Sequence, residues 1–505
     1  MGQWRAGRNC FVNYAGCKVL IMGLGLHGGG LESARYLARR GADLTVTDLR
    51  DESVLAPSLE KLRGLPIRYV LGRHNIEDFE KADMVIKNPG VPPDSPFLRA
   101  ARRVETDISL FLAGSPARLT AVTGSKGKSS AASAIHRTLD LGRRRGLLPG
   151  RAFLGGNITL SPLAFPDDLG PDDDVVLELS SWQLGDLRGR LRDPAPGGDN
   201  AGPDRKDPRG GAGNAAPDCR RGEALLKPRS AVLTAIMPDH LDRYGTMDAY
   251  VADKRVIYQG QDRRDATIAG ADSWGQSFLR ETAGRPLVYA EEPLPGDQAG
   301  GWVLSPQGPG MVRLPSGEIL EAVPEKVLVP GYHQKKNLLA AALCLLDLGL
   351  PPDLVREGLG SFPGIEHRLE FFHESRGIRF YNDTAATIPE AAEAAVAAFD
   401  PPPVLVAGGT DKNLDFSPLV RAAGRAKALV LLAGTGGDTL KVLLEQAGIP
   451  FRGPFDSVDA AVRSALETAE PGDVVVLSPG CASFGMFLNE FDRGRRWKEA
   501  VCRLA

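Results

Sequence analysis

The chain has 505 residues, which is enough for two to four domains. Hydrophobic residues make up 43% and charged residues 25%, and the formal net charge is −2, so the composition is that of globular domains rather than of a strongly basic nucleic-acid binder. No apolar run approaches the roughly 18 residues of a membrane span, and no apolar secretory segment follows Met1. Six scattered cysteines without a CxxC pair predict reduced thiols in a cytosolic protein.

The first segment reads as a strand, a glycine-rich turn and a helix. We expect the strand over 18–22, the turn over Gly23–Gly28 and the helix over 31–39. A second strand over 44–46 ends near Asp48, and a third over 84–86 leads to Asn88. This order predicts a phosphate-bearing ligand at the N-terminus of the helix. The match to the dinucleotide fingerprint is incomplete, so NAD is not required.

The strongest local signal is the segment Thr123-Gly-Ser-Lys-Gly-Lys-Ser-Ser130, between a strand expected over 119–122 and an alanine-rich helix. Glycines let a backbone wrap around a phosphate, and the N-terminus of the helix adds N–H groups. Lys128 is then expected to reach the β- and γ-phosphates, and Ser129 to bind Mg²⁺. Val122 occupies the position of the first glycine in the usual phosphate-loop pattern. The alternative is an ordinary polar turn.

Strands alternate with helices along the rest of the chain. Further strands are expected over 175–177, 231–233, 266–268, 326–329, 378–381, 404–406, 428–432 and 474–477, with an apolar helix over 337–346. This alternation predicts an α/β fold with mostly parallel sheets in three domains. We place the domains at residues 1–114, 115–363 and 364–505.

One stretch, Asp193 to Gly222, has a different composition. It contains seven glycines and five prolines and has no large apolar residue. Such a segment cannot bury enough apolar area to offset the entropy cost of ordering. We interpret it as a disordered insertion, with a functional lid as the alternative.

Several polar clusters follow the expected strands. Glu178 ends a strand where a carboxylate can meet Mg²⁺, although alone it reads as a solvated side chain. Asp239-His240, with Lys254 further on, suggests a second metal position, although a lone histidine is more often structural. The remaining clusters are Gly331 to Asn337, Glu366 to Arg368, Tyr381 to Thr387, Gly408 to Lys412 and Ser478 to Ser483. The last three follow strands, where open α/β sheets bind ligands.

Taken in order, these motifs resemble the Mur ligase family over roughly residues 18–496. The matching segments are TGSKGKSS, GGN at Gly155 to Asn157, LELSSWQL, DHLDRY, the later Lys254, GxHxxxN, HR, NDTAAT, GGTDK and SPGCAS. The resemblance implies a Rossmann-like N-terminal domain for the UDP part of a substrate and a central P-loop-type domain for ATP. It also implies a Rossmann-like C-terminal domain that brings in the amino acid, and a cytoplasmic monomer that uses ATP and Mg²⁺ at two sites.

Within the family, the pattern is most similar to the members that join D-glutamate to UDP-N-acetylmuramoyl-L-alanine. The residues that the resemblance assigns to the UDP substrate are Leu26, His27, Asp48, Asn88 and Asn157. Those assigned to ATP are Thr123, Gly124, Ser125, Lys126, Gly127, Lys128, Ser129, Ser130, Asn337, Arg368 and Asp383. Those assigned to D-glutamate are Thr387, Lys412, Ser483 and Phe491.

The same resemblance assigns the metal ligands Ser129, Glu178, His240 and Lys254, and the catalytic residues Lys128, His240 and Lys254. It implies that Lys254 is carbamylated. The modification makes physical sense, because an ammonium group repels Mg²⁺ whereas a carbamate presents a carboxylate.

Four positions depart from the pattern frequent in the family. Ala385 replaces a lysine, Ala235 an asparagine and His27 a threonine, and Phe491 lies one position later than the usual aromatic residue. A ligase for another amino acid, a folylpolyglutamate synthase-like ligase and a non-catalytic nucleotide-binding homologue remain alternatives. The retained metal-site residues argue against the last.

We predict that replacing Asp193–Gly222 with a short Gly/Ser link leaves ATP-dependent activity within about twofold of the full chain. The physical reason is that this segment lacks the apolar side chains that would dock it on the folded domains. Phosphate release by the deletion variant, after circular dichroism has shown that it is folded, measures the effect. Loss of most of the activity in a folded variant would contradict the prediction.

Overall fold

The computed structural model describes residues 14–26, 28–158, 160–188 and 226–505. His27 and the predicted insertion over 193–222 lie outside these residues. The chain divides into two compact units. The first runs to Tyr289 and includes Leu343–Leu350, and the second consists of Ala290–Ala342 and Pro351–Ala505.

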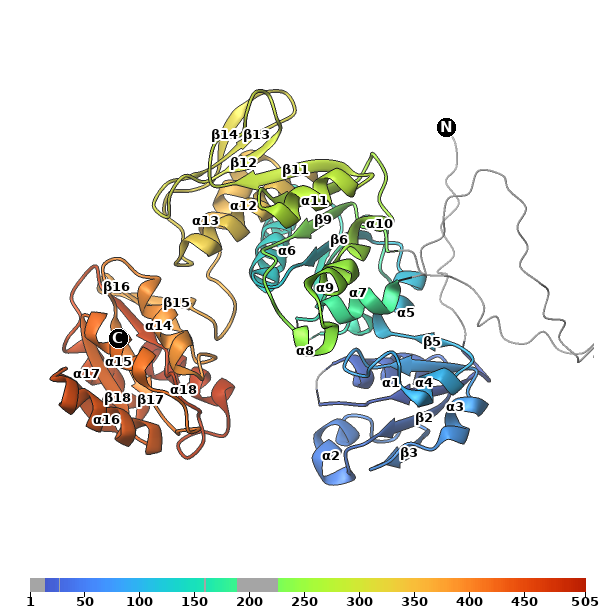
Figure 1. The fold of residues 1–505 in the computed structure, drawn as a ribbon, viewed down its shortest axis with the longest axis horizontal. Coiled ribbons are helices and arrows are strands. Elements are labelled where there is room, and N and C mark those ends of the chain that lie inside the picture. Colours follow the sequence, from blue (N-terminus) through green and yellow to red (C-terminus); the bar gives the residue numbers. More distant parts are fainter. Residues whose placement is uncertain (1–13, 27, 159, 189–225) are drawn as a thin grey trace, which may run out of the picture. The chain divides into compact units, whose positions relative to one another are not determined.

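The first unit begins with a five-stranded parallel sheet of order β3-β2-β1-β4-β5 (Figure 1). Its strands are β1 (Lys18–Met22), β2 (Asp43–Asp48), β3 (Ile67–Leu71), β4 (Met84–Lys87) and β5 (Val104–Glu105). Its helices are α1 (Gly29–Ala38), α2 (Glu52–Glu60), α3 (Ile76–Lys81), α4 (Pro96–Ala100) and α5 (Asp107–Gly114). Side chains of β1 alternate between two apolar cores, because successive residues of a strand point to opposite faces.

A second parallel sheet of the first unit has the order β11-β10-β9-β6-β8-β7. Its strands are β6 (Arg118–Thr123), β7 (Ala152–Gly156), β8 (Asp174–Glu178), β9 (Ser230–Leu233), β10 (Ala266–Gly270) and β11 (Arg285–Ala290). The helical segments are α6 (Lys128–Arg144), η1 (Pro162–Ala164), α7 (Ser181–Leu187), α8 (Leu241–Tyr244), α9 (Met247–Lys254), α10 (Val256–Gln259) and α11 (Ser273–Glu281). In the ladder, Val122 of β6 pairs with Glu178 of β8, so the loops after both strands leave the same edge.

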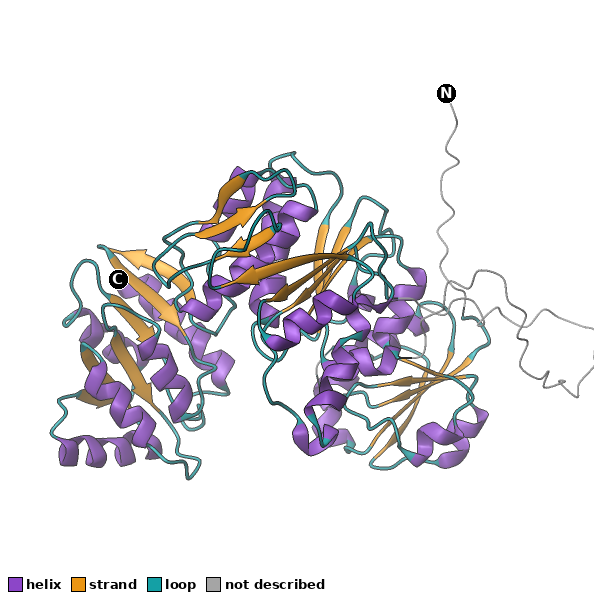
Figure 2. Cartoon of the chain, turned by 45° about the horizontal axis from the view of Figure 1, so that its top comes forward, coloured by secondary structure: helices purple, strands orange, loops and turns teal. Residues whose placement is uncertain are grey.

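The second unit contains antiparallel strands β12 (Gly300–Trp302), β13 (Gly310–Arg313) and β14 (Ile319–Val323). Helices α12 (Tyr332–Asp347) and α13 (Pro352–Gly360) follow in the chain. A six-stranded sheet has the order β15-β16-β20-β17-β18-β19 and is parallel except for β15 (Figure 2). Its strands are β15 (Glu370–Ser375), β16 (Ile378–Asn382), β17 (Val404–Gly408), β18 (Ala428–Leu432), β19 (Arg452–Phe455) and β20 (Val474–Leu477).

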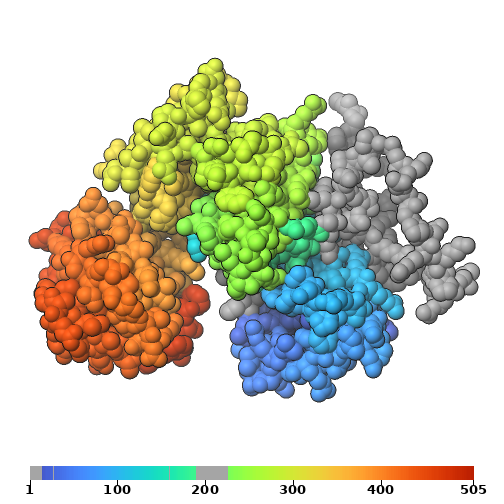
Figure 3. All heavy atoms as spheres, in the orientation of Figure 1, coloured from blue at the N-terminus to red at the C-terminus, as the bar shows by residue number. Residues whose placement is uncertain are grey.

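Five helices cover the two faces of this six-stranded sheet: α14 (Pro389–Ala397), α15 (Ser417–Arg425), α16 (Thr435–Ala447), α17 (Val458–Leu466) and α18 (Glu490–Leu504). Helices α14 to α16 share one buried core with the strands, and α17 and α18 share the other. The space-filling view shows these C-terminal elements, orange to red, as one packed body (Figure 3). Each central strand is therefore covered on both sides, which explains its continuous apolar sequence.

One predicted strand is wrong. Residues 326–329 form no strand and lie in the loop between β14 and α12. Pro324 and Pro330 flank this stretch and supply no backbone N–H to a ladder. Two of the carbonyls in this loop are used by side chains instead: Glu325 accepts from Lys335 Nζ at 2.7 Å, and Leu328 accepts from Tyr381 Oη at 2.7 Å.

Within the described residues, none of the helices has the length and apolar character that crossing a bilayer demands. The described cysteines Cys17, Cys344, Cys481 and Cys502 are free thiols.

Candidate active site

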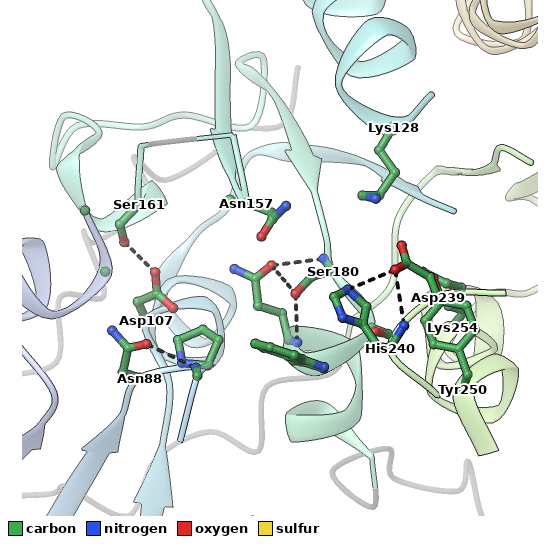
Figure 4. A pocket seen from close by; sticks show the side chains of 18 residues that line it. Asn88, Asp107, Lys128, Asn157, Ser161, Ser180, Asp239, His240, Tyr250 and Lys254 are labelled. Carbon is green, nitrogen blue, oxygen red and sulfur yellow. Dashed lines mark hydrogen bonds and ion pairs between the residues drawn. The ribbon is translucent and has the colours of Figure 1, made fainter. Parts of the chain in front are cut away.

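The first unit contains a cavity of about 530 Å³ (Figure 4). Loops that follow strands of both of its sheets form the walls, as expected for ligand sites in open α/β sheets. The lining residues are Gly28, Gly29, Asn88, Pro89, Gly90, Asp107, Lys128, Gly156, Asn157, Ser161, Ser180, Ser181, Trp182, Gln183, Asp239, His240, Tyr250 and Lys254. Five predicted site residues therefore meet here: Asn88, Lys128, Asn157, His240 and Lys254.

The predicted phosphate loop joins β6 to α6. Gly127, at φ 91°, is the residue before the first turn of α6, and Gly124 has φ 150°. A Cβ on Gly124 would lie 2.0 Å from Thr234 Oγ1, so only glycine fits between the loop and the end of β9. Ser125 Oγ contacts the Tyr250 hydroxyl at 2.9 Å and the Met237 carbonyl at 2.9 Å. The loop is thus fixed from the side of β9 and α9, with the N-terminus of α6 free to receive an anion.

Two lysines converge on one carbonyl of this loop. Lys128 Nζ donates to the Gly124 and Ser125 carbonyls, at 3.1 Å each, and Lys254 Nζ donates to the Gly124 carbonyl at 2.7 Å. Lys254 is only 1% exposed. Burial, followed by the nearby Lys128 charge, lowers the pKa of Lys254 to about 7. Burial also lowers the pKa of Lys128. The neutral amine of Lys254 is therefore accessible near neutral pH.

Glu178 is buried at the end of β8 and uses one of its two carboxylate oxygens. Asn157 Nδ2 donates to Oε1 at 3.0 Å, whereas Oε2 has no hydrogen-bond partner among the described residues. An unpaired buried carboxylate oxygen is unfavourable unless a cation or donor meets it. The ladder places Glu178 at the same sheet edge as the N-terminus of α6, which carries Ser129, so the oxygen atoms of these two residues fit Mg²⁺, which prefers oxygen ligands.

His240 lies across the cavity from Asn88. Its backbone is left-handed, with φ 53°, and 46% of its side chain is exposed. The ring centroid lies 5.1 Å from that of Trp182 and 6.4 Å from that of Tyr250. Lys254 Nζ lies 4.6 Å from the Tyr250 ring centroid, so His240 and Lys254 approach the same tyrosine. An imidazole can bind a metal ion through a neutral ring nitrogen, and His240 therefore offers one ligand atom on this side of the cavity.

The residues predicted for the nucleotide end surround the Gly23–Gly28 turn. Asp48 is buried, and its carboxylate accepts from the Gly25 amide at 3.2 Å and the Arg50 amide at 2.9 Å. Asn88 Oδ1 accepts from the Gly90 amide at 3.1 Å. Leu26 is 38% exposed. Leu26 belongs to the turn and Asp48, at the end of β2, is bonded to it, but neither is among the residues that line the cavity.

The ATP residues predicted in the second unit fall into two groups. Asp383 Oδ2 accepts from Ser478 Oγ at 2.7 Å, and Oδ1 accepts from the Leu369 amide at 3.1 Å, next to the exposed Arg368. Burial raises the pKa of Asp383 to about 7. Asn337 is buried in α12 and donates to Gln334 Oε1 at 3.2 Å. Arg368 and Asp383 are thus brought together, and Asn337 makes no direct contact with either among the described hydrogen bonds.

The loops that carry the predicted D-glutamate residues are joined by backbone hydrogen bonds. Thr410 and Ala482 exchange two such bonds, at 2.9 and 3.0 Å, and the Gly480 amide donates to the Ala386 carbonyl at 2.9 Å. These bonds bring together the loops of Thr387, Lys412 and Ser483. Lys412 is exposed and has no ion pair among the described residues, and Ser483 is buried.

Phe491, also assigned to D-glutamate, is 47% exposed, and its ring lies 5.4 Å from that of His367.

Sequence reasoning missed several residues of the cavity. Asp107 and Ser161, which are bonded to each other, were missed, and Ser180 and Gln183, which form a capping box at the start of α7, were noted only as part of the LELSSWQL segment. Sequence reasoning also missed Tyr250, which touches the phosphate loop, and Arg493, which is buried and bonded to Thr384, Cys481 and Ala482. Asp107 directly follows the N-cap residue Thr106, so in the sequence it is indistinguishable from an ordinary first-turn acid.

Comparison with known proteins assigns this arrangement to a family. Residues 17–109 match the Mur ligase MurD-like N-terminal domain, 212–345 the Mur ligase middle domain, and 367–481 the Mur ligase glutamate ligase domain. Each match lies within one of the three predicted domain ranges. The chain belongs to the Mur ligase family, and its predicted class of three α/β domains is confirmed.

Two relatives that this chain matches over almost their whole length share one enzyme name. The UDP-N-acetylmuramoylalanine–D-glutamate ligase of Treponema pallidum (strain Nichols) is 40% identical over 96% of this chain and 97% of its own. The protein of the same name from Roseiflexus sp. (strain RS-1) is also 40% identical, over 96% of this chain and 98% of its own.

Solved structures share the fold at low identity. The UDP-N-acetylmuramate–alanine ligase MurC of Thermotoga maritima has a TM-score of 0.51 at 17% identity, over 97% of this chain and 100% of its own. MurF of Acinetobacter baumannii has a TM-score of 0.52 at 14% identity, over 96% of this chain and 94% of its own.

Proposed function

We propose that the chain joins D-glutamate to UDP-N-acetylmuramoyl-L-alanine at the expense of ATP, forming ADP and phosphate, in the synthesis of peptidoglycan precursors. The observation that carries the proposal is the convergence of Lys128, Lys254 and the unpaired Glu178 oxygen around one phosphate loop. The names of the relatives at 40% identity support D-glutamate as the amino acid. We place the enzyme in the reducing cytoplasm as a monomer that acts on small molecules.

In the first step, the terminal carboxylate of the L-alanyl substrate attacks the γ-phosphate of ATP, and ADP leaves. The loop from Thr123 to Ser130 holds the phosphates with its amides and with Lys128, whose ammonium group exchanges its carbonyl contacts for phosphate oxygens. The main catalytic contribution of such a site is to stabilise the negative charge of the phosphoryl group during its transfer. The product is an acyl phosphate.

In the second step, the amine of D-glutamate attacks the acyl phosphate and phosphate leaves from a tetrahedral intermediate. We assign Thr387, Lys412, Ser483 and Phe491 to D-glutamate. Lys412 then neutralises a carboxylate of the amino acid and directs its amine. Asn337, Arg368 and Asp383 are assigned to ATP, and Leu26, His27, Asp48, Asn88 and Asn157 to the UDP substrate.

Two Mg²⁺ positions complete the proposal. Ser129 and Glu178 would hold one ion, and His240 with carbamylated Lys254 would hold the other. When bound, Mg²⁺ would neutralise phosphate charge and polarise the phosphoryl oxygens. The pKa of Lys254 near 7 supports carbamylation, because CO₂ adds only to the neutral amine.

A phosphate-release assay tests the proposed function. Full-length enzyme with ATP, Mg²⁺ and UDP-N-acetylmuramoyl-L-alanine is expected to release phosphate with D-glutamate and to do so at least about 100-fold less efficiently with L-glutamate, L-alanine, L-lysine or diaminopimelate. Preference for a different amino acid, or for a folate acceptor, would replace the proposal with the corresponding ligase. Nucleotide binding without turnover would indicate a non-catalytic homologue.

We predict that Lys412→Ala raises the KM for D-glutamate by roughly tenfold or more and changes the KM for ATP by less than about twofold. Lys412 has no ion pair among the described residues, so its charge is available to the substrate, and a tenfold effect corresponds to about 1.4 kcal/mol. Steady-state kinetics measure both constants. Lys441→Ala, which removes another exposed charge, from α16, is the matched control. Equal changes in both constants would show that Lys412 does not anchor the amino acid.

We predict that Lys254→Ala is folded and nearly inactive, and that acetate restores part of its kcat by supplying the missing carboxylate. Lys128→Ala should not respond to acetate, because its role needs a cation. Because the pKa of Lys254 is depressed to about 7, the neutral amine and hence the carbamate are lost as pH falls below 7, and added bicarbonate should oppose this loss in the wild type only. Near-normal kcat in Lys254→Ala, or no carbamate by mass spectrometry under CO₂-trapping conditions, would contradict this role.

A further inference from the structure

The cavity has a buried carboxylate, that of Asp107, which the proposed reaction does not use. Asp107 is the first residue of α5 and is 5% exposed, yet it lines the cavity. We propose that Asp107 is a specificity-determining residue that accepts a hydrogen bond from the hexosamine of the nucleotide-sugar substrate. This inference rests on the proposed function, because it takes a UDP-linked amino sugar as the ligand.

The carboxylate of Asp107 is held firmly but is not saturated. Oδ2 accepts from Ser161 Oγ at 2.8 Å, and Oδ1 accepts from the Ile108 amide at 2.9 Å. A carboxylate has about four acceptor sites, so acceptor capacity remains for a ligand. Ser161 is itself buried, and it belongs to the segment between β7 and η1 that follows Asn157. The two bonds therefore fix the carboxylate before a ligand binds, which lowers the ordering cost of recognition.

No cation compensates Asp107. Within the described part of the chain, no lysine, arginine or histidine side chain lies within ion-pairing distance of it, and burial raises the pKa of its carboxyl group. Asp48, another buried carboxylate near the Gly23–Gly28 turn, is compensated within the protein, because both of its oxygens accept hydrogen bonds from backbone amides, those of Gly25 and Arg50. Burying a carboxylate without a cation is costly, and such groups are found at functional sites more often than elsewhere. A ligand that brings O–H or N–H donors would offset part of that cost.

The position of Asp107 in the cavity indicates which part of the substrate lies next to it. Figure 4 shows Asp107, Ser161 and Asn88 at one side, Lys128, His240 and Lys254 at the other, and Asn157 and Ser180 between them. The reacting L-alanyl carboxylate belongs at the lysine side, next to the phosphate loop. The other end of the same substrate must then extend toward Asp107.

The chemistry of the substrate indicates which of its groups can donate a hydrogen bond to Asp107. Its diphosphate carries only acceptor oxygens and negative charge, which a carboxylate repels. The hexosamine carries hydroxyl groups and an acetamido N–H, which are donors. A Cβ built on Gly29 would lie 3.5 Å from Asp107 Oδ2, so the carboxylate sits directly beside the head of α1, where the diphosphate is expected. The sugar that follows the diphosphate is therefore the moiety within reach of Asp107.

Calorimetric titration of the full-length enzyme with UDP and with UDP-N-acetylmuramoyl-L-alanine tests the proposal. Asp107→Ala is expected to weaken binding of the nucleotide sugar at least tenfold and binding of UDP less than twofold. Asp107→Asn, which keeps the shape and one acceptor oxygen, is expected to lose less and to preserve the same ordering. Glu105→Gln is the matched control, because Glu105 is equally buried two residues earlier, is bonded to Ser109 and lies outside the cavity lining.

Thermal denaturation separates folding from recognition, and Asp107→Asn carries the test if the alanine variant does not fold. Equal weakening of both ligands, unchanged binding of the nucleotide sugar, or the same pattern in Glu105→Gln would overturn the assignment. Turnover of the wild type with D-glutamate judges the proposed function separately. A wild type that binds the nucleotide sugar in an Asp107-dependent way without turnover would support this inference and refute the ligase proposal.

Discussion

Two ammonium groups compete for the carbonyl oxygen of Gly124, and the chemistry of the cavity depends on how that competition is resolved. Lys128 and Lys254 both donate to this oxygen, at 3.1 and 2.7 Å. Two like charges in a buried setting cannot both be favourable, so the more buried lysine gives up its proton more readily. As a result, Lys128 keeps the positive charge that binds a phosphate, whereas Lys254 is available as a neutral amine.

The scaffold creates this competition through strand pairing. β6 lies between β8 and β9, so the loop after β6 meets Glu178 from one neighbour and Thr234 from the other. Helix α9, which follows β9 in the chain, supplies Tyr250 and Lys254 to the same loop. These hydrogen bonds hold the loop between β6 and α6 in place from both sides. Preorganisation of this kind lets donors stabilise charge without rearranging during the reaction.

The sequence predicted most of the buried parallel strands and missed many of the others. The predicted strands β1 and β17 are largely buried and contain apolar runs, VLIM and VLVAG, that are typical of strands covered on both faces. Five of the missed strands, β3, β5, β7, β15 and β19, lie at sheet edges, where one side is solvated or the strand is short. The strands β11 to β14 were also missed, and they are not all edge strands. β19 carries the sequence Arg-Gly-Pro-Phe, which no propensity rule assigns to a strand.

The site was predictable where function requires an unusual residue pattern. A glycine-rich loop and an Asp-His pair followed later by Lys254 were noticed in the sequence, and the structure brings Lys128, His240 and Lys254 to one cavity. Asp107 and Tyr250 were not predictable, because an acid in the first turn of a helix and a tyrosine on an apolar face are common everywhere. Their meaning comes from residues distant in sequence, Ser161 and Ser125, which only the folded chain places beside them.

The crowding around Gly124 also determines how this loop can change during evolution. Its backbone conformation and the 2.0 Å approach of Thr234 leave no room for a methyl group, so almost any substitution there would force β6 and β9 apart. Two residues on, the Lys126 side chain is 71% exposed and only approaches Asp239, at 3.9 Å. One loop thus contains a position that tolerates almost no change, two residues before one whose side chain has room to vary within the protein. Sequence drift in this protein can therefore alter the charge at the rim of the phosphate site while its shape stays fixed.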